Sequence, residues 1–160
     1  MIAVFPGTFD PITIGHVDLI QRILPMFDKV IIAIGVNSKK HTLFPLEKRI
    51  GWIQKVFDGE KKIETGHYEG LTVKYCIEKN ASYVIRGLRS ASDFEYERDI
   101  AQLNRSISDK VDTMFVISAP ELTHISSTIV REIIHYQGDL EKYIPKSVIE
   151  DVKKSFSEIK

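Results

Sequence analysis

Cysteine is nearly absent from this sequence of 160 residues, and charge of neither sign prevails. The single cysteine, Cys76, cannot form a disulfide within the chain, so internal disulfides cannot stabilise the fold. Lysine plus arginine and aspartate plus glutamate each number 22, which gives a formal net charge of zero. No overall field therefore draws the chain to nucleic acid or to a membrane surface, and no apolar run is long enough to span a bilayer. These absences predict that neither nucleic acid nor a membrane is a partner.

The start of the chain lacks the basic residues and the apolar middle of a signal peptide, and residues 2–5 already have the pattern of a strand. We therefore expect a cytoplasmic protein. A length of 160 residues and a hydrophobic content of 43% are sufficient for a full core. We expect a single domain over residues 1–160, because no repeat, linker or low-complexity tract divides the sequence.

Short apolar runs alternate with amphipathic stretches along the chain, which predicts strands alternating with helices. Such an order implies right-handed crossovers and an α/β fold, a doubly wound sheet of five parallel strands with helices on both faces. Ligands bind such sheets at the carboxyl ends of the strands, near the point where the strand order reverses. The expected strands are 2–5, 29–36, 62–65, 81–85 and 112–118, and the expected helices begin at Gly15, Pro45, Leu71, Asp93, Ser126 and Pro145.

The first sixteen residues join a strand, a tight turn and the start of a helix. Pro6 and Gly7 end the apolar run, and helical spacing begins near Gly15. Free backbone N–H groups and the helix dipole make such a start a site for anions. Gly15 permits close approach of a phosphate, and His16 offers a ring nitrogen as a donor. Helix capping is the alternative role for His16.

Polar side chains follow four of the expected strands, and the carboxyl ends of parallel strands meet at one edge of a sheet. A single basic residue is ordinarily a solvated surface charge, but four sets at equivalent positions predict a site for several phosphate groups. The four sets are Thr8 after the first strand, Lys39 and Lys40 after the second, Arg86 and Arg89 after the fourth, and Ser126 to Thr128 after the fifth.

Two short stretches resemble the signatures of a known superfamily. The first is Pro-Gly-Thr-Phe-Asp-Pro at 6–11 followed by Thr13-x-Gly15-His16, and the second is Ile-Ser-Ser-Thr-x-x-Arg at 125–131. Together and in this order they resemble the nucleotidyltransferase superfamily, which is related to the class I aminoacyl-tRNA synthetases. For the second stretch alone, plain helix capping by serine and threonine is the alternative.

The stretch from Ile85 to Glu97, Ile-Arg-Gly-Leu-Arg-Ser-Ala-Ser-Asp-Phe-Glu-Tyr-Glu, is the most specific in the chain. It closely resembles the phosphopantetheine adenylyltransferase family, and the similarity extends over nearly the full length. The resemblance implies a Rossmann-like nucleotidyltransferase fold and transfer of AMP from ATP to 4′-phosphopantetheine, giving dephospho-coenzyme A and pyrophosphate in coenzyme A biosynthesis. It also implies magnesium (Mg²⁺) as cofactor and a homohexamer of single-domain subunits.

The same resemblance implies a role for individual residues. His16 is expected to stabilise charge at the α-phosphorus, and Thr8 to contact both substrates. The implied catalytic residues are His16, Thr8, Lys40 and Arg89, and the implied contacts to phosphopantetheine are Thr8, Lys40, Thr72 and Arg86. The implied contacts to ATP are Thr8, Phe9, His16, Gly87, Leu88, Arg89, Glu97, Leu122, Thr123, His124, Ile125, Ser126, Ser127 and Thr128. Such chemistry requires aligned donors and no nucleophile from the protein, because the substrate phosphate is already a nucleophile.

Two other functions remain compatible with the pattern: a related small adenylyltransferase that acts on nicotinamide mononucleotide, and a module that binds ATP without turnover. The metal ligands are unassigned, because Asp10 before Pro11 suits either a magnesium ligand or a turn. Lys39 and Lys40 are adjacent, and the spacing from Phe44 favours Lys40 as the ligand.

Two residues outside these motifs also carry an expectation. Trp52 falls off the apolar stripe of its helix, which is formed by Leu46, Ile50, Ile53, Val56 and Phe57. Either a subunit interface or a loop is expected to cover its ring. Cys76 has no neighbouring pattern of nucleophilic catalysis, so we expect it to be buried on the third helix.

Overall fold

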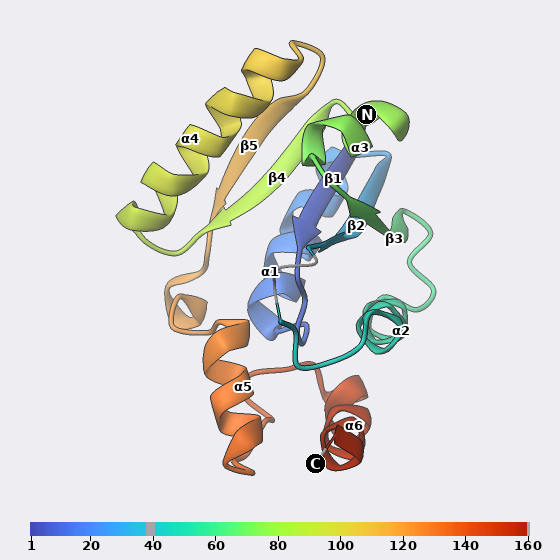
Figure 1. The fold of residues 1–160 in the computed structure, drawn as a ribbon, viewed down its shortest axis with the longest axis vertical. Coiled ribbons are helices and arrows are strands. Elements are labelled where there is room, and N and C mark those ends of the chain that lie inside the picture. Colours follow the sequence, from blue (N-terminus) through green and yellow to red (C-terminus); the bar gives the residue numbers. More distant parts are fainter. Residues whose placement is uncertain (38–40, 160) are drawn as a thin grey trace.

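The computed structural model describes residues 1–37 and 41–159 of the protein. In this part of the chain, five parallel strands form one sheet in the order β3-β2-β1-β4-β5. The strands are β1 (Ile2–Gly7), β2 (Lys29–Val36), β3 (Ile63–Glu69), β4 (Tyr83–Leu88) and β5 (Asp112–Ile117). The chain runs outward from β1 to β3 and then returns to β4 on the other side of β1 (Figure 1). The strand order therefore reverses between β1 and β4, and the predicted doubly wound parallel sheet is confirmed.

Helices cover both faces of this sheet. The helices are α1 (Ile14–Ile23), α2 (Leu46–Val56), α3 (Thr72–Glu78), α4 (Ala91–Ile107), α5 (Ser127–His135) and α6 (Ile149–Ile159). Residues of α1, α2, α5 and α6 share one core cluster, and residues of α3 belong to the core cluster of the opposite face. Figure 1 shows α5 and α6 at the end of the sheet toward which the strands point. This end is where the fold leads us to expect ligands.

The β2 strand shows why the sheet is covered on both sides. Successive side chains of a strand point to opposite faces. Val30, Ile32 and Ile34 enter the core cluster of α1 and α2, whereas Ile31 and Ala33 enter that of α3. A continuous run of branched apolar residues is therefore required, as in other parallel sheets. Within the two described segments, no helix has the length and apolar character needed to cross a membrane.

Three strands extend beyond their predicted ends. The β1 strand, which Pro6 and Gly7 were expected to stop, continues to Gly7, because its ladder with β2 extends to the pair Gly7 and Ile34. The β3 strand continues from Thr65 to Glu69, because its ladder with β2 extends to the pair Val36 and Glu69. The β4 strand continues to Leu88, because its ladder with β5 extends to the pair Leu88 and Ile117. Arg86, which we expected to follow β4, is therefore a residue of the strand, and Arg89 is the first residue beyond it.

Trp52 does not lie off the buried face of α2, and this expectation is wrong. Its side chain is 3% exposed in the main core cluster, and its ring meets that of Phe44 edge-on at a centroid distance of 4.8 Å. Phe44 lies in the segment before α2, so a loop residue of the same chain covers Trp52. The burial of Cys76 on α3 is confirmed, and burial raises the pKa of its thiol to about 12.

Candidate active site

The turn after β1 holds Thr8 and Phe9 at the point where the strand order reverses. Thr8 is half-buried, whereas Phe9 is 1% exposed, with its ring 4.9 Å from the imidazole of His16. The backbone of Phe9 is left-handed, with φ of 48°. A bulky residue adopts this conformation only where its surroundings hold it. The structure thus gives the Phe9 side chain a packing role beneath His16.

A reciprocal cap fixes His16 at the start of α1. The hydroxyl of Thr13 accepts the backbone N–H of His16 at 3.3 Å, and the Nδ1 atom of His16 accepts the backbone N–H of Thr13 at 3.0 Å. Because a backbone N–H can only donate, Nδ1 is the unprotonated nitrogen of the neutral ring. The proton is therefore on Nε2, which is left as a donor. The sequence presents helix capping and donation to a phosphate as alternative roles for His16. In the structure Nδ1 completes the cap, and Nε2 is left to donate.

The imidazole of His16 is held in its neutral form. Its pKa is lowered from 6.5 to about 4, first by burial and then by the positive charges of Arg89 and Arg86. At pH 7 the ring therefore offers a neutral N–H. Such a donor supports developing negative charge on a phosphate.

The guanidinium of Arg86 joins β1, β4 and α4. It donates from Nε to Glu97 at 2.7 Å, from Nη2 to the other oxygen of the same carboxylate, and from Nη1 to the carbonyl of Pro6 at 2.8 Å. Glu97 is 7% exposed and comes from the inner face of α4. The bidentate ion pair with Glu97 and the bond to Pro6 fix Arg86 beside the turn that carries Thr8.

The side chain of Leu19 on α1 packs against the backbone of β4 at Gly87. A Cβ atom at this position would lie 2.4 Å from Cδ1 of Leu19, which is too close for a side chain in this packing. The absence of a side chain at Gly87 therefore leaves room for the Leu19 side chain of α1.

Arg89 is an exposed residue that begins the connection to α4. Its Nε and its backbone N–H both donate to the same oxygen of Asp93 at 3.0 Å. Partial burial alone would raise the pKa of Asp93, but the bonds from Arg89 outweigh it and the pKa is lowered. The positive charge of Arg89, like that of Arg86, lowers the pKa of His16. Both arginines therefore lie near the imidazole.

The second signature contacts the first directly. Ser126 caps α5 by accepting the N–H of Ile129 at 3.2 Å, and the hydroxyl of Ser127 donates to the carbonyl of Pro11 at 2.9 Å. The Nη1 atom of Arg131 donates to the carbonyl of Asp10 at 2.9 Å, and its Nη2 atom donates to the hydroxyl of Thr128 at 3.1 Å. The start of α5 is thereby fixed against the turn after β1.

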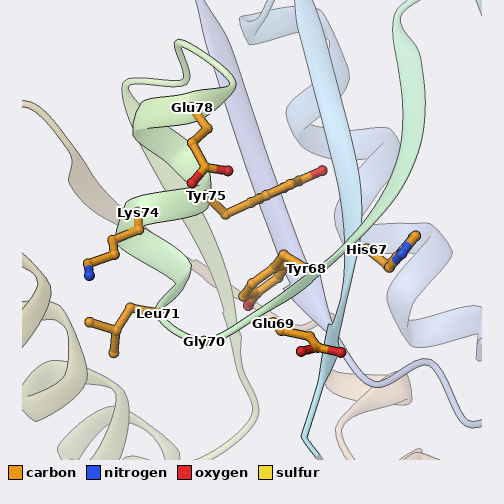
Figure 2. Close-up of a pocket in the computed structure, with 8 residues that line it drawn as sticks. All are labelled: His67, Tyr68, Glu69, Gly70, Leu71, Lys74, Tyr75 and Glu78. Atoms are coloured by element: carbon orange, nitrogen blue, oxygen red, sulfur yellow. The ribbon is translucent and has the colours of Figure 1, made fainter.

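A pocket of about 430 Å³ lies between β3 and α3, beside this edge of the sheet (Figure 2). Figure 2 shows Leu71 and Lys74 extending from the α3 side, with the ring of Tyr68 between α3 and β3. The rings of Tyr68 and Tyr75 stack with centroids 4.8 Å apart, and the hydroxyl of Tyr68 lies 2.7 Å from that of Thr72. Burial raises the pKa of Tyr68, and the positive charge of Arg86 works in the opposite direction. The pocket and Thr72 therefore lie on the Arg86 side of the site.

Comparisons with known proteins agree with this architecture. A family model described as cytidylyltransferase-like matches residues 4–133. Proteins named phosphopantetheine adenylyltransferase are similar over nearly the whole chain. One from Leptospira biflexa is 44% identical over 156 residues, which cover 98% of each chain, and one from Christiangramia forsetii is 44% identical over 146 residues, which cover 91% of this chain and 96% of the relative. The chain belongs to the phosphopantetheine adenylyltransferase family.

A solved structure shows the same fold at lower identity. A protein from Vibrio parahaemolyticus that is assigned as a nicotinate-nucleotide adenylyltransferase superposes with a TM-score of 0.69. The match covers 94% of this chain and 97% of that one, at 18% identity. This likeness extends the fold beyond the phosphopantetheine adenylyltransferases.

The remaining residues that the family resemblance assigns to ATP lie in the segment before α5. Leu122 packs against the core and Ile125 is buried, so both support the segment from within. The hydroxyl of Thr123 donates to the carbonyl of Pro120 at 2.9 Å, whereas His124 is exposed. Lys39 and Lys40 lie outside the described residues, so the expectation that Lys40 is the ligand stays a prediction.

Asp10, which suits a magnesium ligand or a turn, is committed to the backbone. Its side chain is buried, and its two oxygens accept the N–H groups of Leu43 at 2.8 Å and Phe44 at 2.9 Å. Among residues 1–37 and 41–159, no three histidine, cysteine or acidic side chains are grouped as they would be to hold a metal.

Sequence reasoning missed Arg49, which is 5% exposed on α2. Its Nη1 atom donates to the carbonyl of Thr8 at 2.7 Å, and its Nε atom donates to the carbonyl of Phe44 at 3.0 Å. The signal was present, because Arg49 lies three residues after Leu46 and four before Ile53, on the predicted buried stripe. An arginine on such a stripe indicates acceptors inside the fold.

Proposed function

We propose that this protein transfers the adenylyl group of ATP to 4′-phosphopantetheine and releases pyrophosphate. The observation that carries the proposal is family membership over nearly the whole chain. It is supported by His16 and Arg86, two hydrogen-bond donors suited to phosphate, which lie near the end of β1. A phosphate oxygen of the acceptor attacks the α-phosphorus of ATP. The bond from that phosphorus to the oxygen bridging to the β-phosphorus breaks, so the leaving group is pyrophosphate and the product is dephospho-coenzyme A.

His16 supplies the donor for charge that develops at the α-phosphorus. Its Nε2 atom carries the proton because Nδ1 accepts the N–H of Thr13. The lowered pKa keeps this donor neutral at pH 7, so it does not bind the ground-state triphosphate as a full cation. A neutral donor that is already oriented contributes most where charge is largest, in the transition state.

Arg86 serves the acceptor phosphate. Its fixed position between Pro6 and Glu97 supports this role, and so does its closeness to Tyr68, which bonds to Thr72. The pocket beside Thr72 has apolar and hydrogen-bonding walls, which suit the amide-containing arm of phosphopantetheine. Lys40 is assigned to the same phosphate, and Thr8 to both substrates, by the family resemblance.

Mg²⁺ is proposed to bind together with ATP. Mg²⁺ binds readily to substrate phosphates and keeps several of its waters. The commitment of both Asp10 oxygens to backbone N–H groups supports delivery of the ion with the triphosphate. When bound to the triphosphate, Mg²⁺ would offset negative charge on the pyrophosphate, while the residues of the chain align the two reacting groups.

A homohexamer is the proposed assembly. Support comes from β5, an edge strand whose Ile117 is 73% exposed, and from the apolar side chains of Tyr96 and Leu103 on α4, which are 67% and 55% exposed. Exposed apolar residues beside an open strand edge favour association. Sedimentation at micromolar concentration is expected to show an assembly of six 18.3 kDa chains, and a monomer alone would contradict the proposal.

The reaction is tested by pyrophosphate release from ATP and magnesium with 4′-phosphopantetheine, with nicotinamide mononucleotide, and without an acceptor. Release that requires 4′-phosphopantetheine is expected. Release with nicotinamide mononucleotide alone would assign the protein to a different adenylyltransferase specificity. Binding of ATP without release under all three conditions would contradict an enzymatic function.

A further inference from the structure

Two charged side chains are buried behind the turn that carries Thr8. Asp10 is 1% exposed and Arg49 is 5% exposed. Burial of an ionised group is costly unless hydrogen bonds compensate it. In both residues the bonds go to backbone groups near the site, which suggests that their purpose is to hold that backbone.

Phe44 is the residue whose backbone both side chains contact. Asp10 accepts the N–H of Phe44 at 2.9 Å, and Arg49 donates to the carbonyl of Phe44 at 3.0 Å. The same guanidinium donates to the carbonyl of Thr8 at 2.7 Å. Arg49 therefore connects α2, the segment before it and the turn after β1 in one arrangement, which we call the Arg49 clamp.

The clamp acts where the backbone most needs support. Phe9 follows Thr8 and has a left-handed backbone with φ of 48°. Such a conformation persists only where neighbouring contacts determine it. Burial lowers the pKa of the Arg49 guanidinium, and the negative charge of Asp10 works in the opposite direction, which helps to retain the cation.

We propose that Arg49 is a positioning residue that acts through Thr8, and that the clamp sets the position of Thr8 relative to His16 and the reacting phosphates. This role rests on the proposed adenylyl transfer. A guanidinium can hold two carbonyls in a fixed geometry, whereas a lysine ammonium at the same place keeps the charge without the planar fork.

Arg49→Lys is the variant that tests this role, with Arg22→Lys as the matched control. Arg22 also donates to a backbone carbonyl, that of Ile117 at 2.8 Å, but does not contact the turn after β1. Arg49→Lys is expected to lower kcat by roughly 10- to 100-fold with little change in the KM for ATP, since misplaced groups cost rate even when binding persists. Arg22→Lys is expected to keep the wild-type kcat.

A double-mutant cycle with Thr8→Val separates positioning from general stability. If Arg49 acts through Thr8, Arg49→Lys costs less than about threefold in kcat when Thr8 is already replaced. Two results would overturn the role of Arg49. One is a double variant whose loss in kcat equals the product of the two single losses, and the other is a wild-type kcat in Arg49→Lys. If Arg49→Lys does not fold, Asp10→Asn replaces it in the same cycle with the same expectation. A wild-type protein without adenylyl transfer would instead reject the proposed function, and the clamp's catalytic role with it.

Discussion

The Nδ1 atom of His16 lies 3.0 Å from the backbone nitrogen of Thr13 and accepts a hydrogen bond from its N–H group. This one bond determines which nitrogen of the ring can face a ligand. It makes Nε2 the donor, while the same residue completes the cap of α1. A structural role and a chemical role are thereby combined in one side chain.

Replacement of His16 by alanine is expected to lower kcat for adenylyl transfer by about 10²-fold or more, as does removal of other transition-state donors. Steady-state kinetics with both substrates checks this. The KM for ATP is expected to change far less than kcat, because the donor acts mainly on developing charge. His135→Ala, at the far end of α5, is the control and is expected to retain full activity. Wild-type turnover in His16→Ala would exclude the assigned role.

The lowered pKa of His16 predicts a titration near pH 4. NMR of the imidazole C–H resonance, assigned by its loss in His16→Gln, measures this directly. Because the folded-state pKa lies below the ordinary value of 6.5, the unfolded chain binds more protons between pH 6.5 and pH 4. The contribution of His16 to the free energy of unfolding is therefore complete above pH 6.5 and is lost as the pH falls through this window. A midpoint near 6.5 would contradict the neutral donor.

Replacement of Arg86 by alanine is expected to raise the KM for phosphopantetheine more than that for ATP. The guanidinium is lost from the acceptor side, and Glu97 is left buried without its partner. Thermal unfolding of the variant is measured alongside, because a buried unpaired carboxylate also destabilises the fold. An effect confined to the KM for ATP would reverse the assignment of the two phosphate positions.

Trp52→Ala is expected to lower the free energy of unfolding by about 3–5 kcal/mol, as for other large side chains removed from a core. The reason is its burial against Phe44 within one chain. Fluorescence offers a second check, because Trp52 is the only tryptophan. Its emission is expected to be typical of a buried indole and independent of protein concentration. A shift of the emission on dilution would place the ring at a subunit interface.

Periodicity was enough to predict the strands, the helices and the doubly wound order, because each element buries a regular pattern of apolar residues. It failed at Arg86, where a charged residue continues a strand because Glu97, eleven positions later, neutralises it. It also failed at Trp52, which lies on the buried face of α2 against Phe44 and not off that face, although the expected alternative of cover by a loop is confirmed. Both errors have one cause, since a partner brought close by folding is not visible in local spacing.

The candidate site was predictable in its motifs and less so in its connections. The signatures around His16 and Ser127 pointed to one edge of the sheet, and the structure brings them together through the Ser127 hydroxyl and the carbonyl of Pro11. The position of Arg49 on an apolar stripe indicated acceptors inside the fold but not which ones, and the bonds of Asp10 to backbone N–H groups had no local signal of their own. Such bonds depend on the path of the chain, which residue types alone do not specify.

Adenylyl transfer at the α-phosphorus is tested most directly by following two labels of ATP with 4′-phosphopantetheine as acceptor. Label in the α-phosphate is expected in dephospho-coenzyme A, and label in the γ-phosphate is expected in pyrophosphate, with equal amounts of the two products. Label from the γ-phosphate in the acceptor, or no labelled product while ATP is bound, would contradict the proposed reaction and the role of His16 within it.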